Sequence, residues 1–177
     1  LAELGYEVTV ADNYSRRIIA EETDSCSLFR NPKLSDRCEL FKEISGYKIH
    51  SEICDLSEYY LMFDLVKRCK PDTIIHYAEQ PSAPYSMRGF KEADFTLKNN
   101  LGVTFNLIWA VKSLCPEAHI IKLGTMGEYG TPNIDIEEGW IEINHNGRNE
   151  TFLYPRAASS LYHTTKVLDT DLLWFYV

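Results

Sequence analysis

The sequence lacks three features that would assign it to common protein classes. No apolar run approaches the roughly 18 to 20 residues of a membrane helix, so we expect no membrane insertion. The five cysteines are odd in number and include no C-x-x-C pair, so we expect reduced thiols and no bound metal. Only 18 residues are basic against 26 acidic ones, and the formal charge of −8 argues against nucleic-acid or anionic-membrane partners.

The 177 residues are 45% hydrophobic and 25% charged, which fits a globular domain and excludes a disordered chain. The chain begins at Leu1 rather than at an initiator Met. It ends at Val177 within an apolar helical pattern. We therefore expect an internal piece of a longer chain.

Hydrophobic patterns predict alternating strands and helices along the chain. The predicted strands cover 6–12, 47–55, 73–78 and 119–124. Helical patterns cover 18–23, 34–44, 57–69 with Ser57 as the cap, 90–114, and Ala157 to the end, and Gly5 caps a helix that ends at Leu4. This β-α-β-α-β order predicts an α/β fold with a parallel, doubly wound sheet. Asn146-Gly147 between 140–144 and 150–153 predicts an inserted β-hairpin.

Ligands of parallel sheets bind at the carboxyl ends of the strands. That rule selects Asp12, Asp55, the Ala78-Glu79-Gln80 segment and the Gly124-Thr125 step. Asp12 could bind the ribose hydroxyls of a dinucleotide or could simply cap its own loop, and the following Arg16 and Arg17 leave a 2′-phosphate open. The glycine-rich phosphate loop would lie upstream of Leu1. The spacing of Gly124, Gly127 and Gly130 does not replace it.

Tyr162 and Lys166 lie four residues apart, on one face of a predicted helix. A lysine beside a tyrosine favours the phenolate, so we expect Lys166 to lower the pKa of Tyr162 and to make it a base for a hydroxyl proton. The alternative is a core tyrosine with a solvated lysine. Thr125, at a strand end, could hydrogen-bond the same substrate oxygen.

Three further polar positions have two interpretations each. His76 lies in an apolar strand and is expected to be a hydrogen-bonded core residue, whereas His163 is placed for a chemical role. Asn99 and Asn100 lie within the long predicted helix. Either one of them clamps backbone or water under the site, or both lie on an exposed face.

The sequence resembles the extended short-chain dehydrogenase/reductase superfamily in the order of its motifs, which are Asp12, Asp55, Ala78-Glu79-Gln80, Asn100, Thr125 and Tyr162-x-x-x-Lys166. The segments 79–87, 123–139, 145–148 and 154–163 resemble, more narrowly, the family of UDP-sulfoquinovose synthases. The resemblance is weakest between residues 15 and 47. It implies a Rossmann-like fold truncated at both ends, with residues 1–177 forming a partial NAD-binding domain. This domain would lack the N-terminal glycine-rich strand-turn-helix and the C-terminal nucleotide-sugar-binding part.

The resemblance also implies a reaction, in which UDP-glucose and sulfite form UDP-sulfoquinovose with bound NAD. A hydride leaves C4, water is lost across C5 and C6, sulfite adds at C6 and the hydride returns, through 4-keto and 4-keto-5-ene intermediates. By resemblance, Tyr162 is the base, Lys166 also holds the nicotinamide ribose, and Thr125 positions the C4 oxygen.

The remaining site residues follow from the same resemblance. The implied cofactor contacts are Asp12, Asn13 and Arg16 at the adenosine ribose, Ile53 or Leu56 with Asp55 at the adenine, and Ala78, Glu79 and Asn100 further along the cleft. The implied substrate contacts are Gln80, Thr125, Met126 and Tyr162. Glu128 and His163 would lie near sugar C5 and C6.

Two positions depart from related families. Nucleotide-sugar 4,6-dehydratases carry an Asp-Glu pair after the threonine, where this chain has Met126 and Gly127. Glu128 and His163 are therefore the candidate acid and base, although Glu128 could equally be a salt-bridged loop acid. Pro81 stands where the family has arginine, so Arg88 or Arg156 could take over its role.

Two other functions remain open at this point. One is another NAD-dependent nucleotide-sugar epimerase, dehydratase or decarboxylase, and the other is a non-catalytic nucleotide-binding homologue. The resemblance implies a homodimer for the full-length protein, located in the cytoplasm or in the plastid stroma of a photosynthetic eukaryote. The 177 residues alone are expected to be inactive and to bind neither NAD nor substrate with useful affinity.

Overall fold

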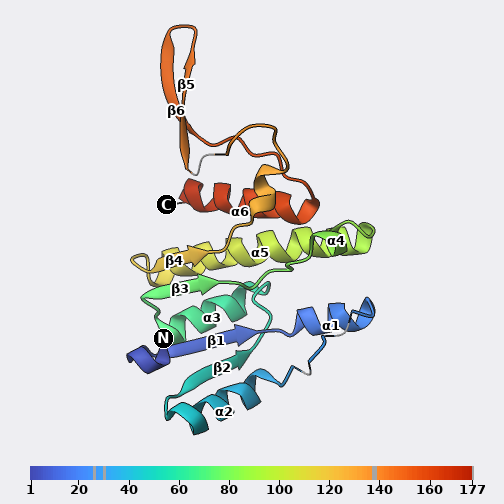
Figure 1. The fold of residues 1–177 in the computed structure, drawn as a ribbon. Helices are drawn as coiled ribbons and strands as arrows, with labels where there is room; N and C mark the ends of the chain where they lie inside the picture. The colour runs from blue at the N-terminus through green and yellow to red at the C-terminus, as the bar shows by residue number, and fades with distance from the viewer. Residues whose placement is uncertain (26, 30, 137–138, 177) are drawn as a thin grey trace.

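The computed structural model describes residues 1–25, 27–29, 31–136 and 139–176. Cys26 and the Glu137-Glu138 pair of the 123–139 segment lie outside the described residues, as do Arg30 and Val177. Four strands run in the same general direction with helices between them, and a hairpin projects from this body (Figure 1). The predicted α/β class is confirmed.

The four strands form two parallel pairs. β1 (Val8–Asp12) pairs with β2 (Ile49–Ile53), and β3 (Thr73–His76) pairs with β4 (His119–Lys122). Within the described residues the two pairs are separate ladders, whereas we expected a single parallel sheet. Each strand is also shorter than predicted. After β2, for example, the Asp55 carboxylate accepts hydrogen bonds from the N–H and hydroxyl of Ser57, and this turn ends the extended backbone.

The helices lie close to the predicted ranges. They are η1 (Ala2–Leu4), α1 (Ser15–Glu22), α2 (Leu34–Ser45), α3 (Tyr59–Cys69), α4 (Ala83–Ser86), α5 (Phe90–Leu114), η2 (Met126–Tyr129) and α6 (Leu161–Tyr176). Gly5 has the predicted left-handed conformation, with φ at 87°. The N-cap position of helix α3 is Glu58 rather than Ser57, and the Ser57 hydroxyl is bound to Asp55 instead. The short α4 and η2 were not predicted.

Helix α6 begins at Leu161, whereas the pattern predicted helix from Ala157. The N–H of Ala157 donates to the Glu128 carbonyl at 2.9 Å, and the N–H of Ser159 donates to the Gly127 carbonyl at 3.3 Å. These bonds fix residues 157–159 against η2 in a non-helical conformation. They also bring the first turn of α6 next to the loop that follows β4.

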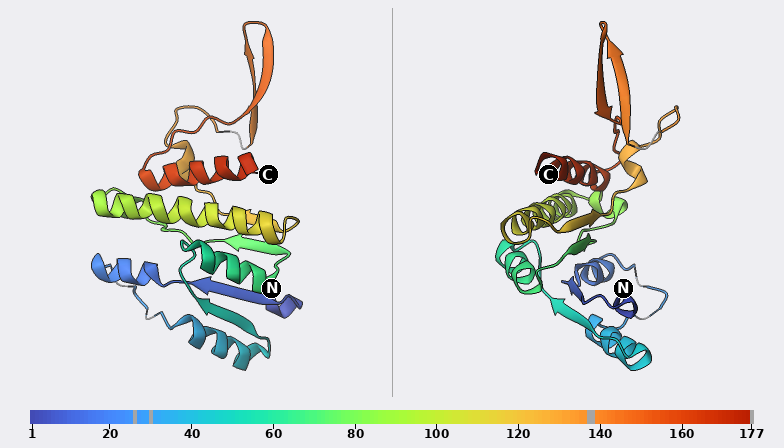
Figure 2. Two further views of the ribbon diagram at one scale, coloured as in Figure 1. Left: turned by 180° about the vertical axis from the view of Figure 1, so that it is seen from behind. Right: turned by 90° about the vertical axis from the view of Figure 1, so that its left-hand side faces the viewer.

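The apolar core lies between α3, α5 and the β3–β4 pair. Helices α3 and α5 lie side by side in both views of Figure 2. The buried cluster consists of Met62 and Val66 on α3 with Val103, Leu107, Ala110 and Val111 on α5. Ile74 of β3 and Ile120 of β4 pack against it. Each Å² of apolar surface that this contact removes from water stabilises the fold by about 25 cal/mol.

The predicted hairpin is confirmed as β5 (Trp140–His145) and β6 (Arg148–Leu153). Asn146 and Gly147 form its two-residue turn with φ at 51° and 74°, the positive values that such turns require. The four cysteines in the described ranges, Cys38, Cys54, Cys69 and Cys115, are free thiols. None of the helices in the described ranges is long and apolar enough to cross a membrane.

Candidate functional site

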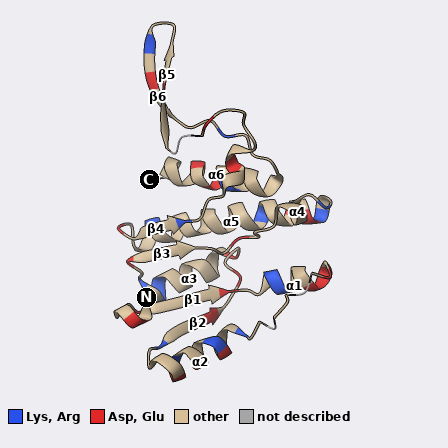
Figure 3. Ribbon diagram, in the orientation of Figure 1, with Lys and Arg blue, Asp and Glu red and all other residues tan. Residues whose placement is uncertain are grey.

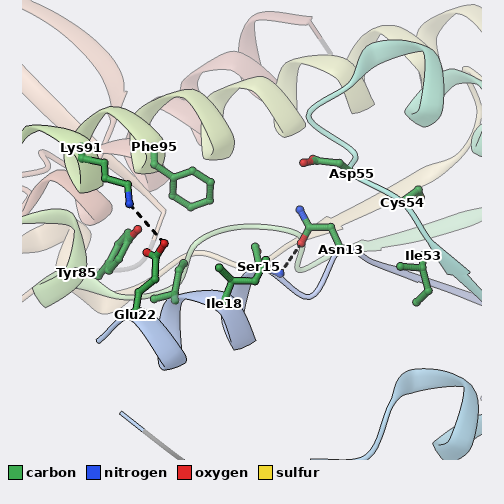
Figure 4. A pocket seen from close by; sticks show the side chains of 11 residues that line it. Asn13, Ser15, Ile18, Glu22, Ile53, Cys54, Asp55, Tyr85, Lys91 and Phe95 are labelled. Atoms are coloured by element: carbon green, nitrogen blue, oxygen red, sulfur yellow. Dashed lines mark hydrogen bonds and ion pairs between the residues drawn. The ribbon is translucent and has the colours of Figure 1, made fainter. Parts of the chain in front are cut away.

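The carboxyl ends of β1 and β2 carry acidic residues (Figure 3) and open onto a cavity of about 480 Å³. Asn13, Ile53 and Asp55 line this cavity, together with residues of α1, α4 and the start of α5 (Figure 4). Three of the predicted cofactor contacts are therefore brought together. Lys91 of α5 pairs with Glu22 of α1 at 3.4 Å and links the two helices beside the cavity.

Asp12 and Arg16 are sequence neighbours of residues that line this cavity, but neither of them lines it. The Asp12 carboxylate accepts the N–H of Tyr14 at 2.6 Å, and the Asn13 side-chain oxygen accepts the N–H of Ser15 at 2.9 Å. Arg16 is exposed on α1. Both acceptors thus hold the turn that joins β1 to α1, which supports the loop-capping role that the sequence left open for Asp12.

Asn100 clamps the backbone of the segment that follows β3. Its side-chain oxygen accepts the N–H of Gln80 at 2.8 Å, and its side-chain nitrogen donates to the Gln80 carbonyl at 3.2 Å and to the Thr165 hydroxyl at 3.0 Å. The side chain is fully buried. The expected buried clamp is confirmed for Asn100, and it ties β3, α5 and α6 together.

All three side chains of the Ala78-Glu79-Gln80 segment are placed differently from our expectation. Gln80 is only 1% exposed, and its amide nitrogen donates to the Thr96 hydroxyl at 2.7 Å, so this side chain does not face an open cleft. Ala78 packs against the apolar core. The side chain of Glu79 is 2% exposed and pairs with Lys166. The polar side chains of this segment therefore support the site from beneath.

Thr125 and Glu128 form a capping box at the start of η2. The Glu128 carboxylate accepts the N–H of Thr125 at 3.1 Å, and the Thr125 hydroxyl accepts the N–H of Gly127 at 3.4 Å. Glu128 is buried, and its second oxygen lies 4.0 Å from Nε of Arg156. The sequence left two roles open for Glu128, a catalytic acid or base and a salt-bridged loop acid. Its contacts in the structure are those of the loop acid.

His163 lies directly over Gly127. Its Nδ1 is hydrogen-bonded to the Ser159 hydroxyl at 2.7 Å, and a Cβ on Gly127 would overlap the far side of the imidazole ring. Glycine is needed here because the ring occupies the space of any side chain. Met126, the next residue of the loop, is 90% exposed. His163 and Met126 therefore flank the same short loop.

Tyr162 and Lys166 lie on one face of α6, as predicted. The Lys166 ammonium is 5.7 Å from the centre of the Tyr162 ring and donates to the Leu123 carbonyl at 3.0 Å. The N–H of Tyr162 donates to the buried Ser86 hydroxyl of α4 at 3.1 Å. These contacts fix Lys166 at the end of β4, two residues before Thr125, and Tyr162 against α4.

The pKa of Tyr162 is shifted in the direction opposite to our prediction. Burial raises the pKa of Tyr162, and the carboxylates of Glu79, Glu128 and Asp169 raise it further. Lys166 does not overcome them, because its own charge is balanced by Glu79. The prediction was wrong because it counted one neighbouring cation, but neither the burial of the phenol, which is the largest cause, nor the nearby anions.

Sequence reasoning also missed Lys122 and Asp169, which lie beside Glu79 and Lys166. The Lys122 ammonium lies 3.3 Å from Glu79 and 3.2 Å from Asp169, and all these side chains are almost fully buried. A signal was available, since Lys122 stands between apolar residues in a predicted strand. Asp169 follows Lys166 by three residues, which places both on the same face of α6.

Comparison with known proteins adds to this geometry. Residues 1–174 match the family described as the NAD dependent epimerase/dehydratase family. The chain is 41% identical over 175 residues to the chloroplastic UDP-sulfoquinovose synthase of Spinacia oleracea, and 45% identical over 174 residues to the UDP-sulfoquinovose synthase of Sulfolobus acidocaldarius. These matches cover 99% and 98% of this chain, but 36% and 44% of the relatives.

Solved structures show the same fold at lower identity. A UDP-glucose 4-epimerase from Bifidobacterium longum, in complex with NAD+ and UDP, matches with a TM-score of 0.69 and 21% identity, over 98% of this chain and 42% of that one. A UDP-glucose 4-epimerase from Brucella ovis, in complex with NAD, matches with a TM-score of 0.66 and 18% identity, over 99% of this chain and 41% of that one.

Proposed function

Because this chain belongs to the NAD dependent epimerase/dehydratase family, we propose that the native protein containing it converts UDP-glucose and sulfite to UDP-sulfoquinovose. The observation that carries the proposal is the identity of 41% and 45% to two UDP-sulfoquinovose synthases over nearly the whole chain. The sequence agrees with it, since Met126 and Gly127 occupy the positions where the related dehydratases carry an acidic pair.

The described residues fit NAD. The cavity at the ends of β1 and β2 presents a side-chain amide, a carboxylate and an aliphatic side chain, a set that suits an adenosine. Asn13, Ile53 and Asp55 would hold the adenosine, with Asp12 and Arg16 beside its ribose. Tyr162 and Lys166 would hold the nicotinamide ribose at the end of β4. Bound NAD would supply the acceptor and later the donor of the hydride at sugar C4.

The chain's own residues would then move the protons. Tyr162 removes the C4 hydroxyl proton, Thr125 hydrogen-bonds the same oxygen, and the Lys166 ammonium stabilises the phenolate. His163, next to the Gly127 loop, is the candidate base for the C5 proton, because the Glu128 carboxylate is held in the capping box. Met126 contacts the sugar from its exposed position. Ala78, Gln80 and Asn100 act from beneath, by fixing the segment after β3.

The proposed reaction balances without net oxidation. The bond from C6 to its hydroxyl oxygen breaks, a bond from C6 to the sulfur of hydrogensulfite forms, and one water leaves. The hydride taken from C4 returns to C4 at the end. No further oxidant or reductant is required.

Labelled sulfite tests the proposal in the native protein. We expect label from ³⁵S-sulfite to enter a UDP-sugar when UDP-glucose is present, and Tyr162→Phe to abolish this incorporation. Tyr60→Phe is the matched control, because Tyr60 is 83% exposed on α3. Formation of UDP-galactose without uptake of sulfite would instead assign a 4-epimerase. NAD binding without any turnover would assign a non-catalytic homologue.

Two further properties belong to this proposal. We propose that the native protein is a homodimer, which light scattering after size-exclusion chromatography tests. We also propose the cytoplasm as its location, or the plastid stroma in a photosynthetic eukaryote, and the relative from Spinacia oleracea is named as chloroplastic. Immunolocalisation in the source organism tests the compartment.

A further inference from the structure

Four buried charged side chains and a histidine form one cluster near Tyr162. The Glu79 carboxylate contacts His76 Nε2 at 3.2 Å and Lys122 Nζ at 3.3 Å, and it pairs directly with Lys166. Lys122 also contacts Asp169 at 3.2 Å. All five side chains are between 0% and 6% exposed. Glu79 is the centre of the cluster, because it contacts every other member except Asp169.

Such a cluster is costly unless its charges balance. Moving a charged group out of water costs several kcal/mol, and only close partners of opposite sign offset this cost. Here the Glu79 carboxylate and the Asp169 carboxyl group, whose pKa is raised to about 7, face the two ammonium groups. Burial lowers the pKa of Lys166, and the Glu79 carboxylate opposes that shift. Burial would raise the pKa of Glu79, but His76, Lys166 and Lys122 lower it to about 2.

We propose that Glu79 is a positioning residue, which acts through Lys166 by holding its ammonium group charged and fixed against the floor of the site. The inference rests on the proposed function, in which Lys166 must be charged to stabilise the Tyr162 phenolate. Lys122 and His76 in turn hold the Glu79 carboxylate. Without Glu79, Lys166 would have Asp169 and the Leu123 carbonyl as its remaining partners in the described residues.

The electrostatic consequence has a definite sign. Removing an anion lowers the pKa of every titratable group near it. The titratable groups that face Lys166 and Tyr162 come from each neighbouring element: Glu79 from the segment after β3, Lys122 from β4, Glu128 from η2, and His163 and Asp169 from α6. His76 of β3 contacts Glu79. Glu79→Gln keeps the shape and removes the charge. It should therefore move the whole pH profile of turnover to lower pH.

The experiment uses the native protein and compares Glu79→Gln, Glu79→Asp and Lys122→Gln. For Glu79→Gln we expect kcat to fall at least tenfold, KM for UDP-glucose to change little, and the pH profile to move down by about one unit. Glu79→Asp keeps the charge and should leave the profile in place. Lys122→Gln removes a cation and should raise the titration midpoint of Lys166. Glu117→Gln, on an exposed turn, is the matched control.

A second readout does not depend on turnover. The ¹⁵Nζ resonance of Lys166, assigned by its loss in Lys166→Arg, reports its titration midpoint, which we expect to fall by about one unit in Glu79→Gln. If turnover with sulfite is absent but this midpoint falls, the inference on Glu79 stands and the proposed function fails. If the midpoint and the pH profile stay in place, the inference is overturned. If Glu79→Gln does not fold, the titration midpoint of Lys166 in Lys122→Gln decides. An unchanged midpoint in that variant overturns the inference on Glu79.

Discussion

Replacing Asn100 by alanine should destabilise the protein strongly, because one side chain holds two backbone groups of the segment after β3. The N–H and the carbonyl of Gln80 both bond to Asn100, which is fully buried within α5. The same side chain donates to the Thr165 hydroxyl of α6. Alanine cannot replace any of these bonds, and water has no access to the position.

The expected magnitude follows from the groups left without partners. A buried donor or acceptor without a partner costs about 1 to 3 kcal/mol, and Asn100→Ala leaves both backbone groups of Gln80 in that state. We therefore expect the free energy of unfolding to fall by about 3 to 5 kcal/mol. The lost apolar contact is small by comparison, since alanine keeps Cβ, the one aliphatic carbon of the asparagine side chain.

Urea denaturation followed by tryptophan fluorescence measures this loss, provided that the slope m is unchanged. Asn106→Ala is the matched control on the same helix. Its side-chain nitrogen donates to the carbonyls of Leu56 and Ser57, in a partly exposed turn where water can replace it. We expect that variant to lose only about 1 kcal/mol. If Asn100→Ala costs no more than Asn106→Ala, the clamp does not hold the segment after β3.

Three other changes test single contacts. Glu128→Gln keeps the capping box and should cost less than about 1 kcal/mol in urea denaturation; if turnover nevertheless falls a hundredfold, Glu128 is an acid or base and the structural interpretation is wrong. Burial and the Glu79 carboxylate raise the pKa of Asp169 to about 7, so ionisation of Asp169 destabilises the fold as pH rises from about 4 to 7. The stability of Asp169→Asn relative to the wild type should therefore rise by roughly 4 kcal/mol across that range, since each pKa unit is worth about 1.4 kcal/mol, and a constant difference in thermal or urea unfolding would contradict the shift. Gly127→Ala should displace the His163 ring and cost about 1 to 3 kcal/mol, while an unchanged His163 imidazole NMR signal would show that the ring does not pack there.

Local patterns in the sequence predicted which elements exist, but they did not predict where these elements end. The ranges of the long helix α5 and of the hairpin were close, because periodicity and an Asn-Gly turn act within a few residues. The start of α6 was wrong by four residues, because the N–H groups of Ala157 and Ser159 bond to the loop that contains η2. Those partners are distant in the sequence, and no pattern near Ala157 reveals them.

For the candidate site too, the sequence predicted some features and not others. Sequence order placed Thr125, Tyr162 and Lys166 at one edge of the sheet, and the structure brings their segments together. The roles of Gln80 and Glu79 could not be predicted, because both follow a strand end, where a side chain can turn into a cleft or beneath it. Only the packing of α5 and α6 over that strand end decides the direction.

The wrong sign of the Tyr162 pKa shift has two physical causes, burial of the phenol first and the charges around it second. One lysine favours the phenolate only if its charge is not already balanced, and a buried lysine requires a nearby anion. In this chain Glu79 supplies that anion and raises the pKa of the tyrosine as well. Lys122 then needs its own partner, which α6 supplies as Asp169. A lysine within an apolar strand, as at position 122, therefore indicates from the sequence alone that carboxylates lie close to it.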